Sequence, residues 1–176
     1  DVLATAIELG APTIRVWAGR QGSAVASAAY RAQVVADSRR IAELSANYQL
    51  TVAYEYHANT LTDHHESAVR LLQEADHPNL YTFWQPPNQA DQAERLAGLN
   101  AILPHLTHIH VFNWDSQRNR FPLAGGEAAW IAFLETIRQT GRDHYASLEF
   151  VQDDAPENFR RDAQTLKQWL QQVNQP

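Results

Sequence analysis

The chain has 176 residues, the length of one ordinary domain, and it contains no cysteine, which excludes a disulfide framework and a cysteine-built zinc site. Its 14 Lys and Arg residues against 20 Asp and Glu residues give a formal net charge of -6, which argues against a non-specific nucleic-acid binder. Because no apolar run approaches the roughly 20 residues of a membrane span, we expect a cytoplasmic protein without a membrane partner.

The first ten residues are typical of a helix that ends at a glycine, here Gly10. The chain begins with Asp1 and contains no Met. Since a translated product needs a start residue, we expect the sequence to be a fragment or a processed chain, with a segment missing upstream.

Five short runs rich in β-branched and aromatic residues follow, and an amphipathic stretch comes after each of them. The predicted strands span residues 13–19, 51–57, 80–85, 108–114 and 145–151. Between them the apolar spacing predicts a helix over 24–47, a second one that Asp63 and Glu66 open with a capping box, and a third over 89–103. A fourth helix is expected to end at Gly141. Asp154 is expected to cap the last helix, with Pro156 in its first turn.

Strands that alternate with helices predict an α/β fold with a parallel sheet. No glycine-rich phosphate fingerprint follows any predicted strand, which disfavours a nucleotide-binding sheet. We therefore expect a (β/α)8 TIM-barrel type of fold. A complete barrel needs about 250 residues, so residues 1–176 are interpreted as a single domain, a partial barrel holding about five of the eight βα units.

Polar side chains near the ends of the predicted strands are the candidates for chemistry. Parallel strands are usually apolar on both faces, and barrel enzymes place their active sites at the carboxyl ends of the strands. Strand alternation puts Glu55, Gln85, His110 and Glu149 on faces that would converge there. His110 is preferred to His108 because it lies nearer the end of its strand.

Two carboxylates, an imidazole and an amide oxygen make a mixed oxygen and nitrogen ligand set. Such a set suits one divalent ion, Mn²⁺, Mg²⁺, Co²⁺ or Zn²⁺. Removing two carboxylates from water without a cation is costly, so a metal explains their placement. Each residue taken alone could equally be a polar group at a solvated strand end, and the argument rests mainly on the pair Glu55 and Glu149.

Four short segments resemble the xylose isomerase-like TIM-barrel superfamily, the sugar phosphate isomerase and epimerase group. They are YEYHANT at 54–60, HIH at 108–110, PLAGG at 122–126 and LEF at 148–150. The resemblance spans nearly the whole chain and covers the later strands and helices of the family. It implies a divalent metal held by Glu, Asp, His and Glu, of which Glu55, His110 and Glu149 match three. Gln85 stands where the family usually has Asp, so this ligand set carries one negative charge fewer.

The resemblance implies a metal-dependent isomerase or epimerase of a small sugar, polyol or keto acid. The metal would polarise the substrate, while Glu55 and Glu149 would act both as ligands and as the acid and base that move a proton next to a carbonyl. The residues expected to bind substrate are His57, Arg15, Trp17, Arg118, Arg120 and Trp114.

Three alternatives remain open. The same superfamily includes dehydratases of inosose and dehydroshikimate, which begin with the same proton abstraction, and a zinc endonuclease, against which the negative charge argues. A non-catalytic barrel that binds a sugar or a partner is the third. Because a partial barrel exposes sheet edges, we expect a homo-oligomer or a missing N-terminal half to cover them.

Overall fold

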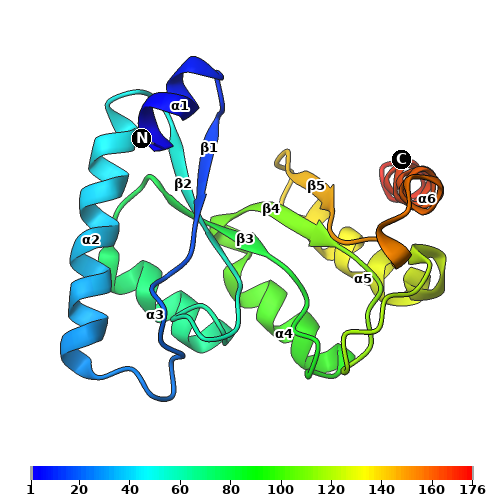
Figure 1. Cartoon of the computed structure of the whole chain (residues 1–176), viewed down its shortest axis with the longest axis horizontal. Coiled ribbons are helices and arrows are strands. Elements are labelled where there is room, and N and C mark those ends of the chain that lie inside the picture. Colours follow the sequence, from blue (N-terminus) through cyan, green and yellow to red (C-terminus); the bar gives the residue numbers. More distant parts are fainter. Residues whose placement is uncertain (1, 176) are drawn as a thin grey trace. The chain divides into compact units, whose positions relative to one another are not determined.

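Strands and helices alternate along the whole chain in the computed structural model, which describes residues 2–175 (Figure 1). The strands are β1 (Thr13–Val16), β2 (Thr51–Glu55), β3 (Leu80–Trp84), β4 (Leu106–Val111) and β5 (Tyr145–Leu148). The α-helices are α1 (Val2–Glu8), α2 (Ala28–Ala46), α3 (His65–Ala75), α4 (Gln92–Ile102), α5 (Glu127–Arg138) and α6 (Pro156–Val173). All five predicted strands are confirmed, and each ends one to three residues earlier than predicted.

The five strands follow their chain order in one sheet, β1-β2-β3-β4-β5. The pairs β1–β2, β2–β3 and β4–β5 are parallel, as strands joined by helical crossovers must be. This arrangement confirms the predicted α/β fold of TIM-barrel type. Within the sheet the chain separates into two compact units, one of residues 1–84 and 104–107 and the other of residues 85–103 and 108–176.

The first unit packs α2 and α3 against its strands. Tyr54, Leu71 and Leu80 are almost completely buried in its core, together with Ala18 and Ala42. Helix α3 shows the apolar stripe that the sequence predicted, because Ala68, Leu71, Leu72 and Ala75 are its buried residues. This core holds β1 and β2 in a register that pairs Arg15 with Ala53.

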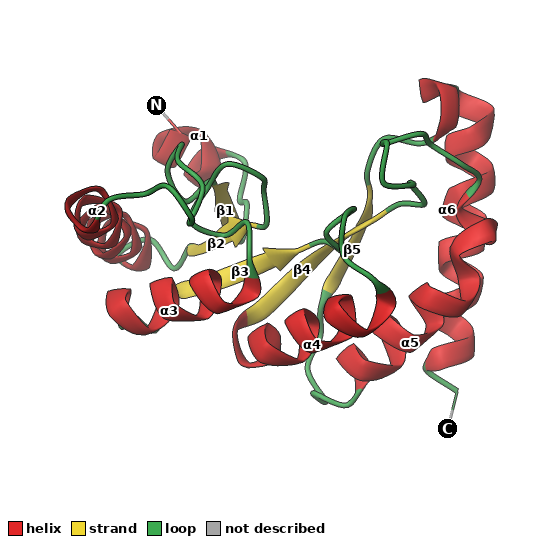
Figure 2. Cartoon of the chain, turned by 90° about the horizontal axis from the view of Figure 1, so that it is seen from below, coloured by secondary structure: helices red, strands yellow, loops and turns green. Residues whose placement is uncertain are grey.

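The second unit is built around α4, α5 and α6, and α5 packs against α6 (Figure 2). Trp130 and Phe133 of α5 and Trp169 of α6 supply its largest buried side chains. Trp130 donates an indole hydrogen bond to the carbonyl of Phe112 at 2.7 Å, which fixes the chain just after β4. None of the helices among residues 2–175 combines the length and the apolar character that crossing a membrane requires.

Two predicted helix caps are wrong. His64, not Asp63, precedes α3, and the carboxylate of Asp63 instead accepts a hydrogen bond from the backbone of Ser23 at 3.0 Å. Ala155 precedes α6, while Asp154 forms an ion pair with Arg120. In both cases a partner more than 30 residues away in sequence takes the carboxylate that a local pattern assigns to the helix.

Candidate metal centre

Glu55 is the last residue of β2 and is only 3% exposed, although its side chain is ionisable. Its carboxylate is held by donors from the neighbouring strand: Nη1 of Arg15 and Nε1 of Trp17 both donate hydrogen bonds to Oε2 of Glu55. The parallel register explains this contact. Arg15 pairs with Ala53, so Trp17, two residues further on, reaches the level of Glu55. A buried carboxylate is tolerated here because a cation and an indole N–H stabilise its charge.

The surroundings of Glu55 include two further residues from the predicted substrate set. The rings of Trp17 and His57 stack with their centroids 4.3 Å apart. Nδ1 of His57 donates to the carbonyl of Ala58 at 2.8 Å, which leaves Nε2 directed away from that bond. Trp17 is 52% exposed and the side chain of Arg15 is 48% exposed, so both present surface to a ligand.

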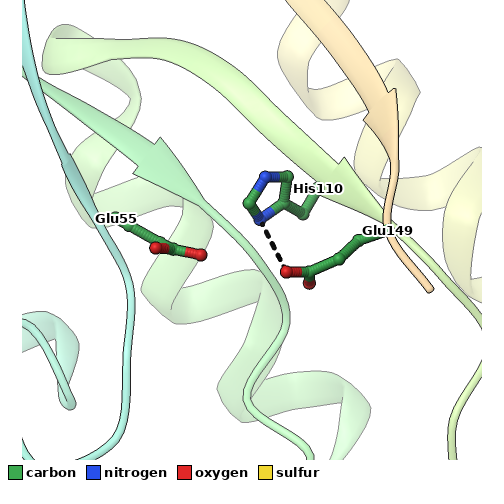
Figure 3. Close-up of side chains that lie close together, drawn as sticks. All are labelled: Glu55, His110 and Glu149. Carbon is green, nitrogen blue, oxygen red and sulfur yellow. Dashed lines mark ion pairs between the residues drawn. The ribbon is translucent and has the colours of Figure 1, made fainter. Parts of the chain in front are cut away.

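The second unit brings together Gln85, His110 and Glu149. Oε1 of Gln85 lies 2.7 Å from Nδ1 of His110. Oε1 of Glu149 lies 3.5 Å from the same nitrogen, a contact that Figure 3 shows. Glu149 follows β5 directly, and its backbone N–H donates to the carbonyl of Val111, which continues the ladder with β4. The side chains of His110 and Glu149 are 13% and 17% exposed, so both are accessible but mostly shielded from water.

The two histidines of β4 have different surroundings. His108 stacks on Tyr145 with ring centroids 4.7 Å apart. Burial, and then the nearby His144, lower the pKa of His108 below its usual range. His110 is the one that lies beside Gln85 and Glu149, and its preference to His108 as a ligand stays a prediction.

The remaining candidates for substrate binding lie in the loop that follows β4. Trp114 stacks on the buried Phe112 with ring centroids 4.1 Å apart. Arg118 is exposed at the tip of this loop with a positive φ of 66°. The guanidinium of Arg120 lies 2.6 Å from Oδ1 of Asp154. Roles for these three residues in binding a substrate stay predictions.

The side chains at these strand ends fit a divalent ion by their chemistry. Glu55 and Glu149 offer carboxylate oxygens and His110 an imidazole nitrogen, a set that suits Mn²⁺, Co²⁺ or Zn²⁺ and, with water, Mg²⁺. Oε1 of Gln85 is the acceptor that faces His110, so the amide orients the imidazole whether or not it also reaches a metal.

Sequence reasoning missed the contacts between Arg15, Trp17 and Glu55. The signal was present, because alternation placed Arg15 and Trp17 on one face of their strand, and a parallel register would have set that face beside Glu55. The pair of Arg120 and Asp154 had no such signal. It joins two irregular loops separated by 34 residues, and no periodicity relates them.

Comparison with known proteins identifies several similar chains. A family model described as xylose isomerase-like TIM barrel matches residues 1–170. A 3-dehydroshikimate dehydratase from Bacillus anthracis is 32% identical over 174 residues, a match that covers 87% of this chain and 61% of that protein.

Solved structures share the same fold. The crystal structure of the probable 3-DHS dehydratase AsbF from Bacillus anthracis matches with a TM-score of 0.82 and 28% identity, covering 94% of this chain and 66% of that one. The structure of an L-ribulose 3-epimerase matches with a TM-score of 0.76 and 13% identity over 97% of this chain and 65% of that one. The chain thus spans about two thirds of the length of these relatives.

Proposed function

This chain belongs to the xylose isomerase-like TIM barrel family. We propose that it acts as a metal-dependent dehydratase of a keto acid of the 3-dehydroshikimate type. The 32% identity to a 3-dehydroshikimate dehydratase over 87% of the chain supports this assignment. That similarity also favours a catalytic role over a barrel that only binds a ligand.

Glu55, His110 and Glu149 are proposed to hold one divalent ion. The observation that carries this proposal is that all three lie at or beside the carboxyl ends of strands in one sheet, and that His110 and Glu149 approach each other to 3.5 Å (Figure 3). An ion bound there would polarise the carbonyl of the substrate and stabilise negative charge on its oxygen. Gln85 is proposed as a fourth ligand or, through its contact with Nδ1, as the group that orients His110.

Glu149 is proposed as the residue that moves the proton. Its side chain is 17% exposed against 4% for Glu55, and Oε2 of Glu55 is already held by Arg15 and Trp17. Glu149 takes the proton from the carbon next to the carbonyl and returns it to the hydroxyl on the following carbon. The C–H and C–O bonds break, a C=C bond forms, and one water leaves.

Arg15 is proposed to bind the carboxylate of the keto acid. Its guanidinium is half exposed and carries a permanent charge, which suits bidentate recognition of a carboxylate. Trp17 and His57 present stacked rings beside it, which suit one face of a carbon ring.

An isomerase or epimerase of a small sugar is the second candidate. It shares the first step, removal of a proton next to a carbonyl, and differs in that no hydroxyl is lost. Incubation of the protein with 3-dehydroshikimate and with ketoses in deuterated water separates the two. Loss of water from the keto acid supports the dehydratase, whereas exchange of the proton in a ketose without loss of water supports the epimerase.

The metal site is tested first, by mass spectrometry of the metal content of the purified protein. We expect about one divalent ion per chain after dialysis against Mn²⁺, Co²⁺ or Zn²⁺. The variant Glu149→Gln should lose the ion, and Glu135→Gln, an exposed glutamate of α5, should keep it as a matched control. Absence of metal from the unaltered chain under all three conditions would contradict the proposal.

A further inference from the structure

The loop that follows Glu149 holds an unusual number of left-handed residues. Phe150, Asp153 and Asp154 have φ values of 46°, 57° and 50°, and none of them is glycine. A bulky residue such as Phe is strained in this region because its Cβ crowds the backbone. Strained residues persist only where their surroundings hold them in place, and they gather at functional sites.

Arg120 supplies much of that restraint. Its Nη1 donates to Oδ1 of Asp154 at 2.6 Å and to the carbonyl of Val151 at 3.4 Å. The guanidinium carbon lies 4.9 Å from the centre of the Phe150 ring, within the range of a cation–π contact. One side chain therefore contacts three of the five residues that follow Glu149.

Trp114 holds the same loop from a second point. Its indole nitrogen donates to the carbonyl of Phe150 at 3.3 Å, and the centroids of the two rings are 6.0 Å apart. Trp114 is anchored in turn by its stack on the buried Phe112. Phe150 is thus held through its carbonyl by Trp114 and over its ring by Arg120.

The segment that carries Trp114 and Arg120 is itself held together by hydrogen bonds. The two residues form an isolated antiparallel bridge, and the backbone of Phe121 donates to the carbonyl of Asn113 at 2.9 Å. Between them, the carboxylate of Asp115 accepts hydrogen bonds from the side chain of Asn119 and from the backbone of Asn119 and Gln117. These bonds lower the pKa of Asp115, the side-chain bond from Asn119 most of all.

We propose that Arg120 is a positioning residue, which pins the strained turn after β5 through Asp154 and thereby aims Glu149 at His110. This inference rests on the proposed function, since Glu149 is the proposed ligand and base. It gives Arg120 a different task from the substrate contact expected from the sequence. On this proposal Arg120 acts on the reaction through Glu149.

The test compares Arg120→Met with Arg120→Lys and with Arg160→Met, which removes the same charge from an exposed position on α6. Co²⁺ is the probe, because its visible absorption reports both its dissociation constant and its ligand geometry. We expect Arg120→Met to weaken Co²⁺ binding by about 10- to 100-fold, as loss of a group that orients a ligand does. Arg120→Lys, which keeps the charge but not the planar fork, should recover part of the loss. Arg160→Met should bind as the unaltered protein does.

A second measurement uses no metal. The ¹⁵N shifts of the His110 ring report its contact with Glu149, so they should change in metal-free Arg120→Met and stay unchanged in Arg160→Met. If Arg120→Met does not fold, Asp154→Asn removes the same ion pair with a smaller change.

The outcomes separate the two proposals. If the unaltered protein binds Co²⁺ and Arg120→Met binds it equally well, the positioning role is wrong and the metal site stands. If the unaltered protein binds no metal ion, the proposed function fails, and the His110 shifts alone decide on Arg120. Unchanged shifts would then overturn the positioning role, and changed shifts would support it.

Discussion

At the scale of the residue, Tyr54 on β2 is the clearest case of a titratable group whose burial has a consequence for stability. Its side chain is 1% exposed, and burial raises its pKa to about 12. The phenol must stay neutral in the folded chain, whereas in the unfolded chain it ionises near its ordinary value of 10. Tyr56 is also buried, and its pKa is raised for the same reason.

The expected result is a loss of stability in alkali. A folded pKa above the unfolded one contributes stability that is complete below pH 10 and is lost as the pH rises through about 12. A difference of two pH units corresponds to about 2 to 3 kcal/mol of unfolding free energy. Urea unfolding at a series of alkaline pH values measures it. Tyr54→Phe should flatten the decline, whereas Tyr48→Phe, at a position 55% exposed, should follow the unaltered protein. Equal slopes in all three would show that Tyr54 is not the cause.

At the scale of the element, α4 begins with a complete capping box. Oδ1 of Asp91 accepts from the backbone of Glu94 at 2.9 Å, and Oε2 of Glu94 accepts from the backbone of Asp91 at 3.0 Å. Asp91→Ala should lower the unfolding free energy by about 1 kcal/mol, because it leaves a backbone N–H at the helix start without an acceptor. Asp91→Asn should retain most of the stability, since Asn caps helices equally well. Denaturant unfolding of the unaltered protein and the two variants measures these free energies. An equal loss of unfolding free energy in both variants would show that the charge of Asp91 matters and its capping bond does not.

The same sequence pattern does not form a capping box at α3. The comparison of the two helices shows which features can be predicted from neighbouring residues in the sequence. Asp63 and Glu66 have the same spacing as Asp91 and Glu94, and only the second pair forms a box. Asp63 is drawn away because the backbone N–H of Ser23, in the loop after β1, reaches its carboxylate. The existence and order of the strands and helices follow from periodicity within each segment. Where a side chain has a distant competitor for its hydrogen bond, the sequence does not reveal which partner it takes.

In the candidate site, too, local patterns predict some features and miss others. Alternation in parallel strands is enough to propose Glu55, Gln85, His110 and Glu149 as candidates, because each lies at or near the carboxyl end of a strand whose other residues are mostly apolar. The contacts of Arg120 were beyond reach, because they depend on the paths of two loops.

At the scale of the whole molecule, the proposed metal site takes its ligands from strands that are far apart in the sequence. Glu55 ends β2, His110 lies on β4, and Glu149 directly follows β5. An ion that binds only the folded protein stabilises every part that supplies a ligand, by about 2.7 kcal/mol at 100 times its dissociation constant. Saturating Mn²⁺ should therefore slow amide hydrogen exchange in β2 as well as in β4 and β5. Glu55→Gln should abolish the protection of β2, and protection confined to β4 and β5 would remove Glu55 from the ligand set.

Trp17 also makes this chain its own optical probe. Its half-exposed indole is hydrogen-bonded to Glu55 and stacked on His57, whereas Trp84, Trp130 and Trp169 are at most 3% exposed and Trp114 is partly buried. Indole fluorescence responds to the polarity of its surroundings and to its hydrogen-bond partner, so the red edge of the emission belongs mainly to Trp17, with a smaller share from Trp114. An ion that binds the Glu55 carboxylate, or a ligand that displaces the imidazole of His57, will shift or quench the emission of Trp17. Binding of an ion or ligand beside Trp17, Glu55 and His57 can therefore be followed in real time without a label.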